Sequence, residues 1–204
     1  MSAVGEAFIA SIGRPELPTP SGLEFNNKAA RRIWEALYRE IGAGWFSNRF
    51  LYLFGPGLDA FLPCLDAWSF LVEPGHERMI IGRNAYGALL VAEDPTQMGL
   101  RCPLFVLDPL NVRYWTHPHL VLVNLIGNWL PRRRLPDFFD RRLYDAWVGV
   151  TGKFLELNEI LAMSVPKPLG GKMAPDHFIV EDIVSYYSAT GCIYARATQD
   201  RAEG

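Results

Sequence analysis

The chain has 204 residues, 50% of them hydrophobic and 13% aromatic, which is enough to bury a core as one domain or as two small, closely packed ones. Its formal net charge of −2 excludes a global electrostatic attraction to nucleic acid or to an anionic membrane. Three scattered cysteines without a Cys-x-x-Cys pair argue against a disulfide framework and a thiolate metal cluster. The sequence shows no signal-peptide pattern. Its apolar runs are all much shorter than the roughly 20 residues that are needed to cross a bilayer. These features predict a cytoplasmic protein that is not bound to a membrane.

The first 68 residues predict a helical region. Residues 3–12 carry apolar side chains at the spacing of a short helix, and a proline-rich connector follows. A second helix is expected from a Ser21 cap to about Ile41, because its apolar residues recur every three or four positions. The rest of the region predicts a loop or a short strand at 44–56 and a short helix at 59–68 that Pro63 interrupts.

The middle of the chain, from residue 69 onward, predicts strands. Short apolar runs alternate with turn sequences rich in glycine, proline and asparagine. The connections are too short for parallel crossovers, so neighbouring strands must run antiparallel. The runs predict a four- or five-stranded antiparallel meander at 69–72, 78–81, 88–92, 104–107 and 112–115.

The last third of the chain predicts helices that cover this sheet. One helix is expected at 120–130, and a longer one from Pro136 to about Met163, in which Gly149 and Gly152 are weak points. A turn-rich loop at 164–176, an apolar final element at 178–195 and a frayed tail at 198–204 complete the chain. The fold class is therefore α+β: N-terminal helices, the antiparallel meander and C-terminal helices packed on it, with regions 1–68 and 69–204 packed as one unit.

His117-Pro118-His119 is the most metal-like feature of the sequence. Two histidines two positions apart on a strand point to the same side, and imidazole suits zinc or copper. A third ligand has no recognisable position, since only His76 and His177 remain among the histidines. The alternative interpretation is that the pair marks the end of a strand, with Pro118 starting a helix. A metal-dependent hydrolase that uses His117 and His119 is kept as an alternative function.

Other chemical motifs are missing their necessary partners. No Gly-x-Ser-x-Gly elbow is present, and the glycines near Lys172 lack the spacing of a phosphate-binding loop. Five arginines at 132–134 and 141–142 suit phosphate contact or capture of an acidic partner, but interleaved aspartates at 137, 140 and 145 favour a solvated helix junction. We therefore expect no catalytic residues, no cofactor and no direct binding of nucleic acid.

Clusters of carboxylates beside aromatic residues predict a surface that binds another protein. Aromatic anchors and charge complementarity dominate the energetics of protein interfaces, so such a surface suits a basic partner. Paired carboxylates also suit magnesium, and an ordinary solvated surface is the third interpretation. The candidate partner-binding residues are Glu93, Asp94, Asp176, Glu181, Asp182, Tyr186 and Tyr187.

The order of motifs resembles a family of bacterial immunity proteins. The segment Phe8 to Pro15, the helix with Ile33-Trp34 and Leu37, and Gly44-Trp45 resemble the GAD-like domain, and Ile81 to Gly87 is similar to the start of the meander that follows it. Residues 167–176, Lys-Pro-Leu-Gly-Gly-Lys-Met-Ala-Pro-Asp, resemble the C-terminal domain of immunity proteins against type VI secretion DNase effectors. One departure is His177-Phe178-Ile179-Val180, where relatives carry an acidic-Tyr-Gly-Phe-like stretch.

The resemblance implies a cytoplasmic immunity protein that binds a cognate nuclease toxin and occludes its active or DNA-binding site. It supplies no catalytic residues, and the departure after Asp176 implies that the toxin differs from that of better-known members. An SMI1-like immunity or adaptor protein with another toxin partner is the related alternative. The oligomeric state is left open.

Overall fold

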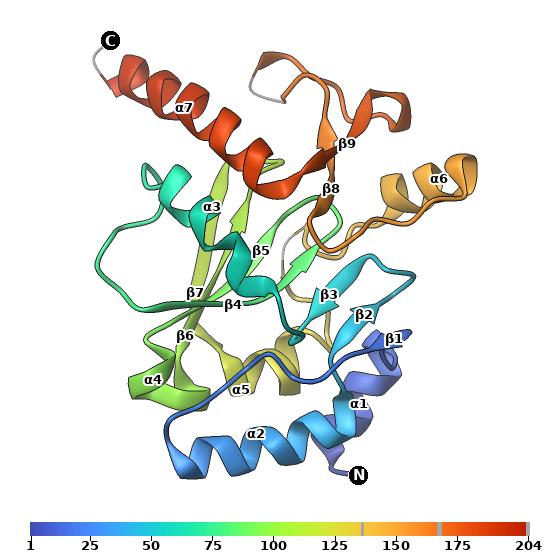
Figure 1. Cartoon of the computed structure of the whole chain (residues 1–204), viewed down its shortest axis with the longest axis vertical. Helices are drawn as coiled ribbons and strands as arrows, with labels where there is room; N and C mark the ends of the chain where they lie inside the picture. Colours follow the sequence, from blue (N-terminus) through green and yellow to red (C-terminus); the bar gives the residue numbers. More distant parts are fainter. Residues whose placement is uncertain (136, 167–168, 203–204) are drawn as a thin grey trace.

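The computed structural model describes residues 1–135, 137–166 and 169–202, with the backbone alone at 175 and 197–202 (Figure 1). Its centre is a seven-stranded antiparallel sheet in which every strand pairs with the next one along the chain. This confirms the predicted α+β class with N-terminal helices, an antiparallel meander and C-terminal helices. The strands are β1 (Leu17–Pro18), β2 (Gly44–Phe46), β3 (Leu51–Leu53), β4 (Arg78–Asn84), β5 (Leu89–Glu93), β6 (Pro103–Asp108) and β7 (Arg113–Val121).

The sheet is longer than the predicted meander because three strands come from the region expected to be helical. Residues 44–56 form the β2–β3 hairpin, whose turn places Ser47, Asn48 and Arg49 at φ of 56°, 60° and 57°. β3 then pairs with β4, so the sheet crosses the boundary predicted at residue 68. The strand predicted at 69–72 is wrong: these residues form turns after a helix and lie outside the sheet.

Both faces of the sheet are buried, since alternate residues of β5 and β6 enter two different apolar cores. Leu90 and Val106 face a core closed by α1 (Ala3–Ile12), α2 (Lys28–Ile41) and α6 (Arg142–Thr151). Leu89 and Phe105 face a second core closed by α3 (Leu62–Ala67) and α7 (Ile183–Ala202). Short helical segments complete the coverage: η1 (Leu58–Phe61), α4 (Pro95–Met98), η2 (Gly99–Arg101), α5 (Leu122–Asn124) and a π-helical turn at Leu125–Trp129.

The N-terminal helices follow the sequence with one correction at a cap. α2 begins at Asn27, not at Ser21, and the Asn27 side chain accepts bonds from the backbone N–H groups of Ala29 and Ala30. The Ser21 hydroxyl instead accepts a bond of 2.8 Å from the Trp34 indole. The interruption expected at Pro63 is present, because Pro63 stands at the start of α3, where its missing N–H costs nothing.

The C-terminal part departs most from the prediction. The helix expected to reach Met163 is only the ten residues of α6, which ends at Gly152 in a left-handed conformation with φ of 64°. The chain then forms β8 (Glu159–Met163), which pairs with β9 (Phe178–Asp182) after a short 3-10 turn at Pro175–His177. α7 follows β9 at once and continues to Ala202 through most of the predicted tail. The expected start of the long helix, Pro136, lies outside the described residues.

The remaining composition-based expectations concern cysteines and membranes. Cys64 and Cys102 are buried, whereas Cys192 on α7 is exposed, and all three are free thiols. Burial raises the pKa of the Cys64 thiol to about 12. In the part of the chain that the structure describes, no helix is long and apolar enough to cross a bilayer.

Arg83 on β4 is a fully buried guanidinium that ties the sheet to the chain before β8. It donates to the carbonyls of Asn84 at 3.1 Å and Glu156 at 2.6 Å, and it lies 5.0 Å from the Trp45 ring centroid. No carboxylate among the described residues forms an ion pair with it, and burial lowers its pKa to about 9. The side chain therefore stabilises the fold through carbonyl and ring contacts, not through an ion pair.

Replacing this side chain tests its structural role. We expect Arg83→Ala to lower the free energy of unfolding by about 3 kcal/mol, because it leaves a cavity and removes the guanidinium bonds to two carbonyls. Urea denaturation followed by circular dichroism measures the effect. The matched variant Arg32→Ala, at an exposed position of α2, should change stability by less than about 0.5 kcal/mol. Equal losses in the two variants would contradict the role assigned to Arg83.

Candidate functional site

The connection between β4 and β5 receives hydrogen bonds from most of the C-terminal part. Asn84 fixes its shape by accepting bonds from the N–H groups of Tyr86 and Ala88, and it donates to the carbonyl of Phe138 at 3.2 Å. Three later elements each donate one further bond to this connection. Tyr144 N–H of α6 donates to the Tyr86 hydroxyl, and Leu161 N–H of β8 donates to the Ala85 carbonyl. The Tyr187 hydroxyl of α7 donates to the Gly87 carbonyl. This connection therefore helps to position α6, β8 and α7, which follow the meander in the chain.

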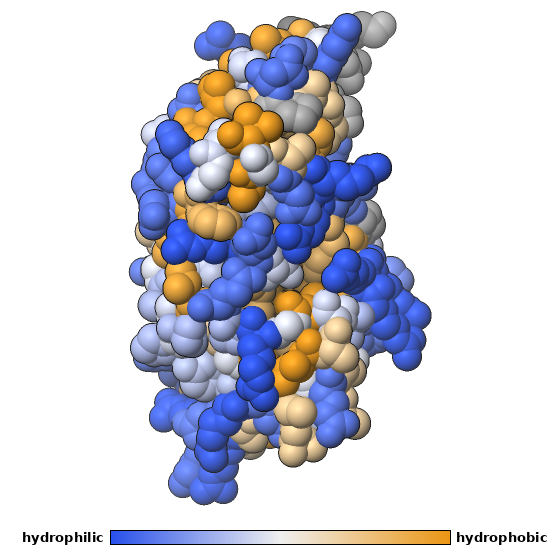
Figure 2. All heavy atoms as spheres, turned by 90° about the vertical axis from the view of Figure 1, so that its right-hand side faces the viewer, coloured by the Kyte–Doolittle hydropathy of each residue, from blue (hydrophilic) through white to orange (hydrophobic). Residues whose placement is uncertain are grey.

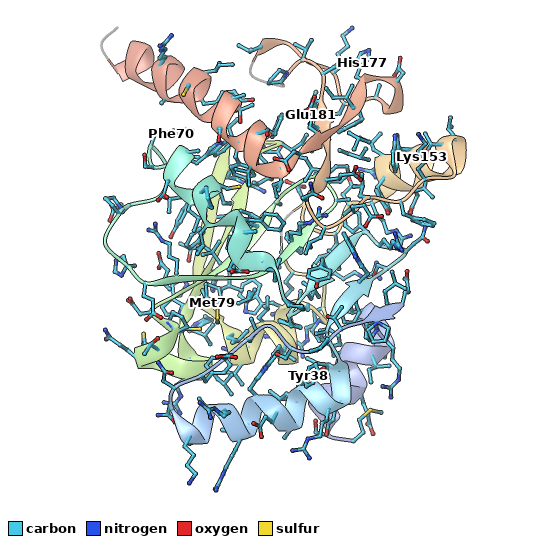
Figure 3. The ribbon with its side chains drawn as sticks, in the orientation of Figure 1. Tyr38, Phe70, Met79, Lys153, His177 and Glu181 are labelled. Carbon is cyan, nitrogen blue, oxygen red and sulfur yellow. The ribbon has the colours of Figure 1, made fainter. Side chains whose placement is uncertain are left out.

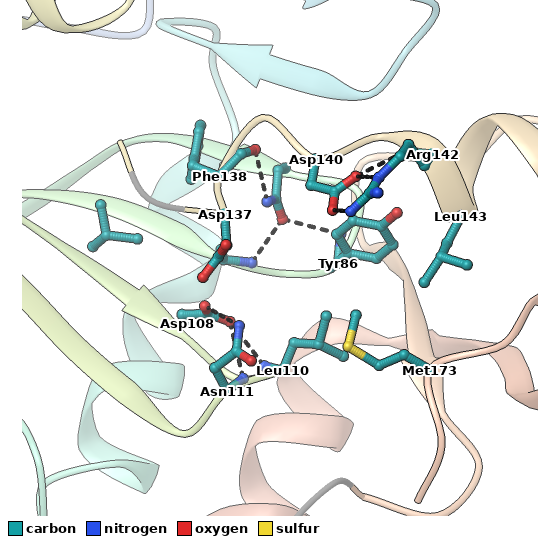
Figure 4. Close-up of a pocket in the computed structure, with 13 residues that line it drawn as sticks. Tyr86, Asp108, Leu110, Asn111, Asp137, Phe138, Asp140, Arg142, Leu143 and Met173 are labelled. Atoms are coloured by element: carbon teal, nitrogen blue, oxygen red, sulfur yellow. Dashed lines mark hydrogen bonds and ion pairs between the residues drawn. The ribbon is translucent and has the colours of Figure 1, made fainter. Parts of the chain in front are cut away.

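A cavity of about 480 Å³ opens beside this connection (Figure 4). Its inner walls are mainly apolar and buried, and its mouth carries charged side chains from the segment before α6. Met173, from the loop between β8 and β9, forms one side of the mouth. The lining residues are Asn84, Tyr86, Ala88, Val106, Asp108, Leu110, Asn111, Asp137, Phe138, Asp140, Arg142, Leu143 and Met173.

The charged groups of the cavity already have hydrogen-bond or ion-pair partners. Asp140 accepts from Arg142 at 2.9 and 2.6 Å, and these bonds hold the pKa of Asp140 below its usual range. Asp137 pairs with Arg113 at 3.1 Å. Asp108 is buried and accepts bonds from the N–H groups of Leu110 and Asn111. With these groups paired, apolar residues such as Val106, Leu110 and Leu143 remain as the part of the lining that an apolar group could contact.

Exposed apolar side chains gather around the β8–β9 ribbon. Figure 2 shows apolar surface at the end of the molecule that carries this ribbon. A contiguous exposed apolar patch is typical of an interaction surface. These residues belong to one segment of the chain, in which the adjacent strand residues Ile179 and Val180 point to opposite faces of β9. We define the C-terminal patch by its five members and their exposed fractions: Val165 49%, Leu169 55%, Met173 41%, Ile179 42% and Val180 42%.

Three of the predicted partner-binding carboxylates lie beside the C-terminal patch. Asp176 and Glu181 are exposed, and Figure 3 shows Glu181 at the opposite end of the molecule from Tyr38 of α2. Asp182 is half-buried: it accepts bonds from Ser185 N–H at 2.9 Å and from the Asn158 amide, which lower its pKa. Asp182 therefore stays ionised next to the ribbon.

The other predicted carboxylates lie elsewhere. Glu93 and Asp94 end β5 and lead into α4, at the lower end of the molecule in Figure 1, away from β9. Asp94 accepts a bond from Glu77 N–H and lies 3.0 Å from the His76 imidazole, while Glu93 lies 4.0 Å from Arg78. The structure thus does not bring these two residues together with Asp176, Glu181 and Asp182.

The two predicted aromatic anchors on α7 differ in exposure. Tyr186 is half-buried, with burial raising its pKa. Tyr187 is fully buried: its hydroxyl donates to the carbonyls of Gly87 at 2.9 Å and Leu107 at 3.3 Å, and burial raises its pKa well above the ordinary value. Tyr187 is therefore a core residue, and its assignment to a partner surface is corrected.

The predicted histidine pair is exposed on β7. The two rings lie 5.5 Å apart, and the His117 ring also lies 4.9 Å from the Trp129 ring. His119 N–H donates to His117 Nδ1 at 3.1 Å, so this nitrogen is occupied as an acceptor. No group of three or more potential metal ligands occurs in the described part of the chain. Pro118 lies within β7 and does not start a helix, because the strand continues to Val121.

The arginine-rich stretch has the character of a solvated junction. Arg141 binds Asp145 and Arg142 binds Asp140, with shortest distances of 2.7 and 2.6 Å. Arg133 donates to the Ser11 carbonyl and so links this segment to α1. Two of the five arginines therefore have carboxylate partners, as expected for a solvated junction with interleaved charges.

Sequence reasoning missed the C-terminal patch and the cavity. Val165, Leu169 and Met173 stand four residues apart in a loop between prolines and glycines, where periodicity does not distinguish exposed from buried positions. One signal was available: large apolar residues are unusual in a turn-rich loop on a protein surface. The cavity depends on contacts between residues more than 50 positions apart, and a single sequence carries no signal for them.

Comparisons with known proteins identify a fold and leave the family open. No family model and no curated protein matches the sequence. Among solved structures, the crystal structure of Atu4351 from Agrobacterium tumefaciens is similar, with a TM-score of 0.61 and 15% identity over 91% of this chain and 87% of that chain. At this identity the likeness shows a shared fold alone.

The core role of Tyr187 leads to a stability prediction. We expect Tyr187→Phe to lower the free energy of unfolding by about 1 kcal/mol, because the Gly87 and Leu107 carbonyls lose a buried donor. Tyr38→Phe, which removes a half-buried bond to the Thr19 carbonyl, should cost less. Urea denaturation of both variants measures the difference. An unchanged midpoint for Tyr187→Phe would show that its hydroxyl does not stabilise the fold.

Proposed function

We propose that this chain is an immunity protein that binds a cognate nuclease toxin of a type VI secretion system and blocks it by surface occlusion in the cytoplasm. The observation that carries the proposal is the C-terminal patch, which exposes large apolar side chains beside carboxylates and beside a cavity. The resemblance of residues 8–15, 81–87 and 167–176 to immunity proteins supports the choice of a nuclease as the partner. The chain itself neither cuts nor binds DNA.

The apolar part of this surface favours a protein partner. Leaving five large apolar side chains in water costs free energy that burial in an interface recovers, at about 25 cal/mol per Å² of apolar area. Met173 belongs both to the patch and to the mouth of the cavity. A side chain of the partner that crosses the patch at Met173 can therefore enter the cavity and act as an anchor.

The charge of the same surface favours a basic partner. Residues 153–185 carry five carboxylates and three lysines, so this segment holds a formal charge of −2, as much as the whole chain. The segment that contains the ribbon is therefore net acidic. A nuclease needs a basic face to bind DNA, and carboxylates on an inhibitor can take the positions of the phosphates and speed association.

Co-expression tests the function directly. We expect the chain to rescue cells that express the nuclease encoded by the adjacent reading frame, and the purified proteins to form a stable complex without nuclease activity. Survival counts and a plasmid-cleavage assay measure the two effects. An adaptor would bind the nuclease and leave it active. Absence of any complex with the product of the adjacent reading frame would overturn the proposal.

A matched pair of variants tests the surface. We expect Leu169→Lys to weaken binding of the nuclease at least about tenfold, or 1.4 kcal/mol, because it places a charge in the apolar contact and adds to the repulsion from a basic partner. The control variant is Ile33→Lys on α2, at the other end of the molecule. The Ile33 side chain is 52% exposed, close to the 55% of Leu169, and we expect this variant to bind the nuclease as tightly as the unmodified chain does. Isothermal titration calorimetry measures both affinities. Equal affinities would place the interface elsewhere.

A further inference from the structure

The hydrogen-bond register of the β8–β9 ribbon shows which backbone groups are unused. Ser164 N–H donates to the His177 carbonyl and Ile183 N–H donates to the Asn158 carbonyl. In an antiparallel ladder, residues that exchange such bonds alternate with residues that do not. The pairs 162–179 and 160–181 therefore exchange bonds across the ribbon. The N–H and C=O groups of Val180 point away from β8, to the outer edge of β9.

The inner edge of the ribbon is attached to the body of the protein, whereas its outer edge is open. Leu161, the residue opposite Val180, directs its N–H away from β9 and donates to the Ala85 carbonyl at 2.8 Å. No strand pairs with the outer edge of β9 among the described residues. Val180 is 42% exposed there, and its backbone N–H has no acceptor in the described part of the chain.

The open edge of β9 lacks the devices that protect the other edges. Proteins commonly blunt an edge strand with proline, lysine or a bulge, because unpaired backbone groups invite another strand. Edge strand β1 contains Pro18 and has only two residues, and edge strand β7 contains Pro118 and an irregular register against β6. β9 contains neither proline nor lysine, and its two charged residues, Glu181 and Asp182, are confined to its second half.

The side chains along this edge define what would fit against it. The first half of β9 offers the apolar side chains of Ile179 and Val180, and the second half offers the carboxylates of Glu181 and Asp182. A strand added to the edge would meet apolar neighbours at one end and acidic neighbours at the other. A complementary segment therefore carries apolar residues followed or preceded by lysine or arginine.

We propose that the outer edge of β9 is the docking site for an extended basic and apolar segment of the partner protein, which adds to the ribbon as a third strand. This inference deepens the proposed function and rests on it, since it names the way in which the nuclease is recognised. Main-chain bonds from Val180 supply affinity, and the apolar and acidic halves of β9 supply specificity.

A second copy of this chain fits the edge less well. Antiparallel pairing of two β9 strands about Val180 would place Glu181 opposite Ile179 of the other copy, because the positions 179 and 181 are symmetric about 180. No cation would face the carboxylates of either chain. Charge complementarity therefore favours a basic partner over self-association.

The substitution Val180→Pro tests the edge with little effect on the ribbon. Proline is tolerated on an edge strand where its missing N–H would face solvent, and the N–H of Val180 is not part of the ladder with β8. We expect Val180→Pro to weaken binding of the purified nuclease at least about tenfold, while Val180→Thr, which keeps the N–H and the β-branched shape, stays within about threefold. Circular dichroism and the unfolding midpoint confirm that both variants are folded.

Hydrogen exchange of the backbone amides tests edge docking without the nuclease. In the free protein, the amides of Ile179 and Glu181 should be protected and that of Val180 should exchange rapidly. A Lys-Lys-Val-Val or Val-Val-Lys-Lys peptide should protect the Val180 amide, and a Glu-Glu-Val-Val peptide should not. Three results would overturn the inference. The first is slow exchange of the Val180 amide in the free monomer, and the second is equal protection of that amide by all peptides. The third is a dimer, detected by light scattering, that Val180→Pro abolishes.

The outcomes separate this inference from the proposed function. If the nuclease binds the unmodified chain and Val180→Pro equally well, edge docking is wrong and the immunity function stands. If the nuclease binds neither the unmodified chain nor Val180→Pro, the proposed function is wrong, and the edge-docking inference then has no partner.

Discussion

The structure depends on the hydrogen bonds that converge on the β4–β5 connection. Asn84 shapes this turn, and α6, β8 and α7 each send one bond to it, through Tyr144, Leu161 and Tyr187. Each of these bonds joins residues separated by more than 50 positions. Such groups cost free energy when they are buried without partners, so the turn specifies a single placement of the C-terminal elements on the sheet.

A second constraint follows from the double coverage of the sheet. β5 and β6 have buried side chains on both faces, which is typical of a sheet covered by helices on each side. The N-terminal helices close one face, and α3 with α7 closes most of the other. The β8–β9 ribbon lies at the border between these two cores, with Leu161 in one and Ile160 in the other. The outer edge of β9 pairs with no further strand in the described part of the chain.

The sequence was informative where periodicity and turn chemistry decide the structure. The spacing of apolar residues located α1 and most of α2, and the turn sequences located β4, β5, β6 and only the start of β7, which continues to Val121. The prediction is wrong for β8, where a helix is expected, and it gives a loop or a short strand at 44–56, where β2 and β3 form. Residues in these strands are apolar at nearly every position, and buried strands and buried helices then look alike. Gly152 had been noted as a weak point, and it ends α6.

For the candidate site, local sequence was a weaker guide. Asp176 and Glu181 are exposed, and their role in partner binding stays a prediction, whereas Tyr187, predicted as a surface anchor, fills the core. Adjacent residues on a helix face different directions, so Tyr186 and Tyr187 have different environments that depend on how α7 is rotated against α3. That rotation is set by Trp68, whose indole donates to the Tyr187 carbonyl at 3.0 Å, a contact 119 positions apart.

The agreement between strand order and sequence order has a consequence for synthesis of the protein. Each strand of the large sheet pairs with the one made just before it, so the sheet can assemble progressively as the chain leaves the ribosome. The ribbon and α7 come last and dock onto a turn that is already in place. The surface that we propose for the partner therefore forms after the large sheet.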